Sequence, residues 1–142
     1  MMQLRPAGPD DAPALARLSG EFGYSDEVAP LRERLLALLR QADQTVWLAE
    51  EDGEVLGWMN ARINQQLESP PHAEISGLVV TTRRRSQGIG AALVAQAEQW
   101  ARARGLNELR VRSRLERTRA HAFYQRQGYA ELKTQLCFHK AL

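Results

Sequence analysis

Three arginines and two glycines stand close together at residues 83–94, RRRSQGIGAALV. An apolar, strand-like run precedes them and an amphipathic, helix-like run follows, so the glycines fall where a helix begins. Backbone N–H groups at a helix N-terminus are unpaired and carry partial positive charge, and glycine lets an anion approach the backbone closely. The stretch therefore predicts a phosphate-binding loop. A glycine turn that serves only tight packing is the alternative.

Two well-known phosphate-binding motifs do not fit this stretch. A P-loop requires a lysine directly after its second glycine, and no lysine follows here. A dinucleotide-binding fingerprint requires a third glycine where this chain has Leu93. The loop must therefore belong to another class of anion site, if it binds an anion.

The net charge of +2 conceals an uneven distribution of charge. Residues 1–82 hold six arginines and thirteen acidic residues, a formal charge of −7, whereas residues 83–126 hold eleven arginines and three acids, a charge of +8. Such segregation creates a field that attracts charged ligands, although arginines on helices are often only solvated. A nucleic-acid binder is disfavoured because residues 102–126 contain few aromatic residues and no lysine.

Hydrophobic periodicity predicts the elements that position the loop. Helices are expected from Asp10-Asp11 onward and at 28–41, 90–104 and 118–126. Strands are expected at 3–5, 45–50, 54–64, 73–81, 109–111, 129–132 and 134–139. The order β-α-α-β-β-β-α-β-α-β-β predicts an α/β fold, a mixed sheet with helices on its faces.

The length of 142 residues fits a single domain, 1–142. No apolar run is long enough to span a membrane, and the N-terminal residues lack the core of a signal peptide, so a cytoplasmic protein is expected. Cys137 is the single cysteine, and the three histidines are far apart in sequence. We therefore expect no disulfide and no metal site.

Three motifs, in order, resemble those of the GNAT superfamily of N-acetyltransferases, in particular its small single-domain bacterial members. The stretch RSQGIG resembles the acetyl-CoA signature Gln/Arg-x-x-Gly-x-Gly/Ala. The run EISGLVV before it resembles the fourth strand of that family, and AHAFYQRQGY at 120–129 resembles its later Phe-Tyr and Gly-Tyr motif. The chain departs from many relatives by lacking an asparagine at 113–119, after the fifth strand.

This resemblance implies acetyl-CoA as co-substrate, with its pyrophosphate on the backbone amides of the glycine loop. It also implies that the fourth strand splays from its neighbour and that the pantetheine arm bonds to the exposed backbone there. No spacing argument selects which of Arg83, Arg84 and Arg119 meets the 3′-phosphate. The implied cofactor-binding residues are Leu78, Val79, Val80, Arg85, Ser86, Gln87, Gly88, Ile89, Gly90 and Ala91.

The resemblance also implies two catalytic residues for direct attack of an amine in a ternary complex. Glu74, fourteen residues before Gly88, is expected to act as the general base, often through water in relatives, and Tyr124 as the general acid at the thiolate. The alternatives are an exposed or ion-paired strand glutamate and a tyrosine that anchors helix to sheet. His121 is not expected to take part.

The acceptor is expected to be a primary amine of a small molecule or peptide, possibly cationic, bound near residues 22–30 and 65–72. Asp26 and Glu27 are candidate contacts for a cation. Trp47 and Trp58 lie in facing hairpin arms, where they either pack together in the core or line a pocket. A CoA-binding sensor or regulatory module without catalysis is the alternative function. No nucleic-acid or membrane partner is expected, and a homodimer stays open.

Overall fold

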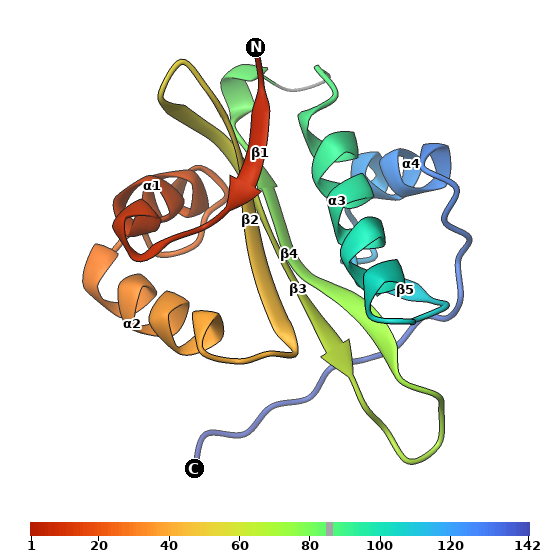
Figure 1. The fold of residues 1–142 in the computed structure, drawn as a ribbon. Helices are drawn as coiled ribbons and strands as arrows, with labels where there is room; N and C mark the ends of the chain where they lie inside the picture. Colours follow the sequence, from red (N-terminus) through yellow and green to blue (C-terminus); the bar gives the residue numbers. More distant parts are fainter. Residues whose placement is uncertain (85–86) are drawn as a thin grey trace. The chain divides into compact units, whose positions relative to one another are not determined.

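A computed structural model describes residues 1–84 and 87–142 of the chain (Figure 1). Arg85 and Ser86, both named as loop residues above, lie outside the described residues. The chain divides into two compact units, Met1–Val111 and Arg112–Leu142, and each is described by itself. No helix of the described chain is long and apolar enough to cross a membrane.

The first unit contains one five-stranded sheet, two helices before its second strand and one helix after its fourth. Short 3-10 turns precede the first helix, at Pro9–Asp11, and follow the fourth strand, at Thr82–Arg84. The elements are β1 (Gln3–Pro6), α1 (Ala12–Glu21), α2 (Val28–Leu39), β2 (Gln44–Glu51), β3 (Glu54–Asn64), β4 (His72–Val80), α3 (Ile89–Ala103) and β5 (Leu109–Val111).

The strands follow one another across the sheet in sequence order, β1-β2-β3-β4-β5. The first four pair antiparallel, and β5 pairs parallel to β4. A tight turn at Asp52 and Gly53 joins β2 to β3, and both residues have positive φ, as such hairpin turns require. The mixed sheet predicted from the sequence is therefore confirmed.

Helices cover both faces of this sheet (Figure 1). On one face α1 and α2 contribute Leu15, Leu18 and Leu35 to a buried cluster. The sheet contributes Leu48 and Val79 to the same cluster. On the other face α3 buries an apolar stripe, whose members are Ile89, Leu93, Val94, Ala97 and Ala101. Burial of these stripes fixes both helices against the sheet, since an amphipathic helix is stabilised mainly by the packing of its apolar face.

Gly57 in β3 lets α3 lie close to the sheet. A Cβ atom at this position would stand 2.9 Å from the carbonyl oxygen of Val79, 3.2 Å from Leu93 and 3.3 Å from Ile89. These distances leave no room for a side chain. The absence of a side chain at residue 57 thus sets how closely the start of α3 approaches the sheet.

The second unit contains one helix, α4 (Thr118–Arg126), as predicted. The strands predicted at 129–132 and 134–139 are wrong, because residues 129–142 form no strand in the structure. Their apolar side chains alternate as in a strand, yet Leu132, Leu136 and Phe138 are exposed. Alternation describes the two sides of an extended segment, but a strand exists only where a neighbour supplies backbone partners.

Candidate functional site

One described residue of the glycine loop has an unusual backbone conformation. Gly88 is the N-cap of α3 and adopts the left-handed region, with φ +82° and ψ 4°. A Cβ atom there would meet no described atom within 4 Å, so the limit at this position is conformational. No side chain of the described chain caps the helix. The first N–H groups of α3 are therefore not satisfied by a side-chain cap.

The helix start is anchored on one side and open on the other. Ile89, the first residue of α3, is 2% exposed and faces the sheet beside Gly57. Gln87 is exposed, and its Oε1 accepts a hydrogen bond of 2.6 Å from Nε of Arg84. Packing at Ile89 thus holds the helix end in place while Gly88 stays exposed to solvent.

One edge of β4 lacks a partner strand beside this helix end. β5 pairs with β4 only at Ala73, Glu74 and Ile75. Residues 77–80 pair with β3 on the other side, and a register shift at Asn60/Ala61 leaves Ser76 without a register partner there. No described strand pairs with the β5-side edge of residues 76–80, which includes Leu78, Val79 and Val80. The resemblance implied a splayed fourth strand with an exposed backbone, and this unpaired edge leaves the backbone open as that arrangement requires.

The predicted base, Glu74, is buried and ion-paired. Its side chain is 4% exposed, and Oε2 accepts hydrogen bonds from Nη2 of Arg62 at 2.8 Å and from Nε at 3.1 Å. Arg62 lies opposite Glu74 in the register of β3 with β4. Such a fork of N–H groups holds a carboxylate in one orientation. The sequence analysis did not identify Arg62, since only the strand register brings the two residues together.

The predicted acid, Tyr124, lies on α4 in the second unit. Its ring makes edge-on contacts with Phe123 and Tyr129, with centroids 5.1 and 6.1 Å apart. Burial raises the pKa of the Tyr124 phenol above its ordinary value of 10.0, and the charge of Arg117 opposes this shift in part. The phenol is protonated at neutral pH, as a general acid must be, but burial makes it a weaker proton donor than a free phenol.

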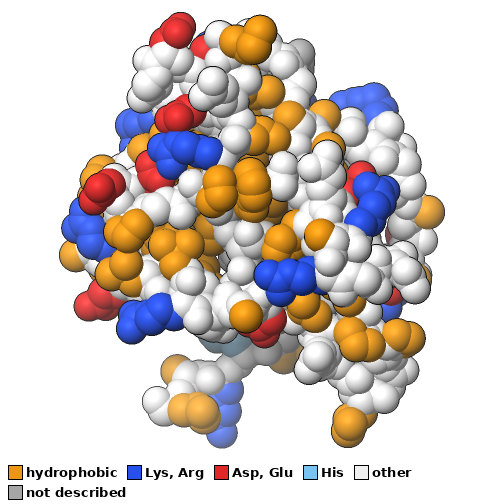
Figure 2. Space-filling view, in the orientation of Figure 1, with side chains coloured by type: hydrophobic (Ala, Val, Ile, Leu, Met, Phe, Trp, Pro, Cys, Tyr) orange, Lys and Arg blue, Asp and Glu red, His pale blue; other side chains and the backbone are white. Residues whose placement is uncertain are grey.

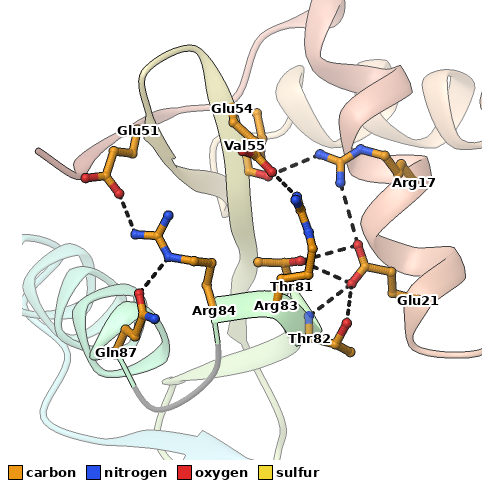
Figure 3. Close-up of polar contacts among 10 residues, drawn as sticks. All are labelled: Arg17, Glu21, Glu51, Glu54, Val55, Thr81, Thr82, Arg83, Arg84 and Gln87. Carbon is orange, nitrogen blue, oxygen red and sulfur yellow. Dashed lines mark hydrogen bonds and ion pairs between the residues drawn. The ribbon is translucent and has the colours of Figure 1, made fainter.

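Arg83 and Arg84 are engaged with acids of the β2–β3 hairpin (Figure 3). Arg83 forms an ion pair with Glu54, and Nη2 of Arg84 lies 2.5 Å from Oε2 of Glu51. On the face drawn in Figure 2, basic and acidic side chains are interspersed rather than gathered into one basic field. The sequence analysis did not identify these ion pairs, because the acids and the arginines lie far apart in the chain.

The two tryptophans of the hairpin do not pack together. Trp47 lies opposite Met59 and Trp58 opposite Leu48, so the two side chains point to opposite faces of the sheet. Nε1 of Trp47 donates a hydrogen bond of 2.9 Å to Thr45, and Trp58 packs against the α1–α2 core. The structure thus excludes their mutual stacking. In the proposed acceptor region, Asp26 and Glu27 are exposed.

The arrangement of histidines, cysteines and acids bears on whether the described residues could hold a metal ion. Among residues 1–84 and 87–142, no group of three or more histidines, cysteines or acids is arranged to hold a metal ion. The chemistry available to the described residues is therefore backbone donation at the helix start and strand edge, together with proton transfer by carboxylate or phenol.

The sequence profile of the acetyltransferase (GNAT) family matches residues 13–129 of the chain. The chain belongs to this family. As a GNAT enzyme it is an acyltransferase of the N-acetyltransferase type that uses acetyl-CoA. The resemblance drawn from its three motifs is thereby confirmed, and so is the mixed α/β fold.

Two curated relatives of this GNAT enzyme match it over nearly its whole length. The aminoglycoside N(6')-acetyltransferase type 1 of Stenotrophomonas maltophilia is 32% identical over 98% of the chain and 93% of the relative. The aminoalkylphosphonate N-acetyltransferase of Salmonella typhimurium strain LT2 is also 32% identical, over 99% of the chain and 91% of the relative. Both relatives carry names of enzymes that acetylate amines of small molecules.

Solved structures share the fold of this GNAT enzyme. The aminoglycoside 6'-N-acetyltransferase AAC(6')-Ih of Acinetobacter baumannii superposes with a TM-score of 0.86 at 24% identity and covers 100% of the chain and 99% of its own. AAC(6')-Iy, solved with the bisubstrate analogue CoA-S-monomethyl-acetylneamine, gives 0.88 at 18% identity, with 100% and 99% covered. At these identities the likeness concerns the fold alone.

Proposed function

We propose that this GNAT enzyme acetylates a primary amine of a cationic small molecule, of which an aminoglycoside is the leading candidate. Acetyl-CoA would bind with its pyrophosphate at Arg85, Ser86, Gln87, Gly88, Ile89, Gly90 and Ala91 and its pantetheine arm along Leu78, Val79 and Val80. The observation that carries the proposal is the open, left-handed Gly88 at the start of α3, beside the edge of β4 that has no β5 partner.

The chemistry needs two proton transfers. An ammonium group with a pKa of about 10.4 must lose a proton before its nitrogen can attack. Glu74 would take this proton through a water molecule, since the side chain is buried and Arg62 holds its Oε2. Because Glu74 is buried, proton transfer through water is more favourable than direct contact between its carboxylate and a bulky acceptor.

The amine nitrogen then attacks the thioester carbonyl, so that an N–C bond forms and the C–S bond breaks. Tyr124 would give its phenolic proton to the departing thiolate and recover a proton from solvent. The place of Tyr124 in the family's Phe-Tyr motif supports this role, and the phenol is protonated at neutral pH as the role requires. The attacking nitrogen gives its second proton to water, and Glu74 releases the first to solvent. Carboxylate and phenol therefore end the cycle in their starting states, with one proton released overall.

The acceptor class is supported by charge and by relatives. Residues 1–82, which include the proposed acceptor region, carry a formal charge of −7, and Asp26 and Glu27 are exposed there. Carboxylates of this kind favour a polycationic aminosugar. An aminoalkylphosphonate carries an anionic group and would need an exposed cation at the same place. It is the second candidate because one relative with 32% identity bears that name.

A panel of amines tests this proposal. Release of the CoA thiol is measured with sisomicin, neamine, a polyamine, a lysine peptide and an aminoalkylphosphonate, each at saturating acetyl-CoA. We expect turnover with the aminoglycosides at kcat/KM at least tenfold above the other acceptors. If the enzyme prefers the aminoalkylphosphonate, the proposed acceptor class is wrong, but the proposed reaction, N-acetyl transfer, still holds. No turnover with any amine, despite acetyl-CoA binding, would support the CoA-binding module without catalysis.

A further inference from the structure

A short turn at residues 81–84 connects β4 to the glycine loop. Thr81 is fully buried, and its N–H donates a hydrogen bond of 2.8 Å to the carbonyl oxygen of Leu56 in β3. The N–H of Arg84 donates to the carbonyl oxygen of Thr81 at 3.2 Å. The turn therefore directly precedes the glycine loop in the chain.

The carboxylate of Glu21, the last residue of α1, forms hydrogen bonds to this turn (Figure 3). Its Oε1 accepts hydrogen bonds from the backbone N–H of Thr82 at 3.0 Å, the Thr82 hydroxyl at 3.1 Å and the Thr81 hydroxyl at 3.2 Å. Bonds in which one partner is charged are shorter and stronger than neutral ones. Glu21 therefore fixes the backbone of the turn as well as its side chains.

Glu21 is itself held in place by its neighbour one turn earlier in α1. Nη1 of Arg17 lies 3.6 Å from Oε2 of Glu21, and Nη2 of Arg17 donates to the carbonyl oxygen of Val55 at 3.2 Å. The turn is thus tied to α1 and, through Arg17, to β3. Glu51 and Glu54, in contrast, contact the turn through its arginine side chains, and Glu51 also pairs with the N-terminal ammonium of Met1.

Glu21 directly precedes the segment that joins α1 to α2. Phe22, the next residue, begins the segment at 22–27 that lies between α1 and α2 and belongs to the proposed acceptor region. We propose that Glu21 is a positioning residue that aligns the backbone leading into the glycine loop and so sets the affinity for acetyl-CoA without contacting it. This inference rests on the cofactor site given under the proposed function.

The test compares two variants of Glu21 with a matched control in the full chain. Asp11 is the control because its carboxylate likewise accepts a backbone N–H, from Gly8 at 2.7 Å, and hydrogen bonds from Arg5. Glu21→Ala removes every bond to the turn, whereas Glu21→Gln keeps an oxygen that can accept from Thr82. The dissociation constant of acetyl-CoA is measured by calorimetry, together with kcat, KM and the thermal midpoint.

We expect Glu21→Ala to raise the dissociation constant and KM for acetyl-CoA about tenfold, with kcat at saturation within about twofold of wild type. Glu21→Gln should fall between wild type and Glu21→Ala. Asp11→Ala should lower the thermal midpoint and leave the dissociation constant unchanged. Should Glu21→Ala not fold, Thr82→Ala tests the same contact from the turn side and should raise the constant by a smaller factor.

Three results would overturn the inference. They are an unchanged dissociation constant in folded Glu21→Ala, an equal rise in Asp11→Ala, and a fall in kcat with no change in KM. Failure of the wild-type protein to bind acetyl-CoA would instead refute the proposed function, and the inference with it. If the wild type binds acetyl-CoA and substitution of Glu21 leaves the dissociation constant unchanged, only the inference is refuted. The two failures are therefore distinguishable.

Discussion

At the scale of single residues, Gly88 combines a special backbone conformation with open space. Its φ of +82° disfavours any L side chain, although a Cβ atom would meet no described atom within 4 Å. Gly105, directly after the C-cap of α3, has the same two properties, with φ +75° and open space. The two glycines therefore separate the cost of a strained backbone from the cost of blocking a ligand.

We expect Gly88→Glu to abolish acetyl-CoA binding and Gly105→Glu to leave it intact. Both changes should destabilise the fold by about 1–2 kcal/mol because a left-handed residue gains a Cβ atom. Only the Gly88 variant places a negative charge where the pyrophosphate is proposed to bind. Calorimetric titration with acetyl-CoA and a thermal melt of each variant check this. Equal binding by the two variants would remove the glycine loop from the cofactor site.

Tyr124 gives a second test at the residue scale, with Tyr129 as its control. Tyr124→Phe keeps the ring and its edge-on contacts but removes the proton donor, so kcat should fall about 10²–10³-fold with KM nearly unchanged. Tyr129→Phe should leave kcat within about threefold of wild type. Steady-state kinetics at neutral pH measure both. A wild-type kcat in Tyr124→Phe would show that the phenol only anchors α4.

At the scale of elements, the close approach of α3 to the sheet depends on Gly57. A methyl group at Gly57 would press on the carbonyl of Val79 at 2.9 Å and on two side chains of α3. Gly57→Ala should lower the free energy of unfolding by about 1–3 kcal/mol, since an overpacked contact must shift its neighbours. The same shift separates the start of α3 from β4, so acetyl-CoA should bind more weakly.

Gly8→Ala serves as the control for Gly57→Ala. A Cβ atom there would have a single described neighbour, Oδ2 of Asp11 at 3.9 Å, and its φ of −119° suits any residue. Its effect on stability should stay within about 0.5 kcal/mol. Denaturant unfolding of both variants makes the comparison. Equal stability of the two variants would mean that α3 can move without cost.

At the scale of the whole molecule, carboxylates engaged in hydrogen bonds link stability to pH. Arg5 beside Asp11 holds the pKa of that carboxyl below its ordinary value of 3.8, and the backbone N–H of Thr82 holds the pKa of Glu21 below 4.5. A carboxyl whose pKa is lower in the folded state binds protons more weakly there than in the unfolded chain. Its contribution is therefore present above the ordinary pKa and is lost as the pH falls.

We expect the thermal midpoint to be nearly constant above about pH 5 and to fall below about pH 4.5. The double variant Asp11→Asn, Glu21→Gln lacks these two carboxyls, so its midpoint should lose about 5 °C less than wild type between pH 6 and pH 3. Thermal melts over this range measure the difference. Parallel curves for the two proteins would show that these carboxyls do not govern acid stability.

The sequence alone determined the local elements and the class of protein. Period-two and helical patterns located β3, β5 and α4 with the bounds that the structure gives, and the other elements to within two residues. RSQGIG and the flanking motifs indicated the family that the comparison confirmed. These features were predictable because they depend on residues near one another in the chain, where spacing reports directly on structure.

The tertiary structure decided what depends on partners distant in sequence. The pairing of Glu74 with Arg62 follows from strand register. The hydrogen bond from Thr82 to Glu21 follows from the packing of α1 beside the end of β4. The arginines of the turn are paired because the β2–β3 hairpin lies near them. The same reason explains the wrong strands at 129–139, where an alternating pattern met no partner strand. Register and packing join residues that no local pattern connects, so only the folded chain reveals them.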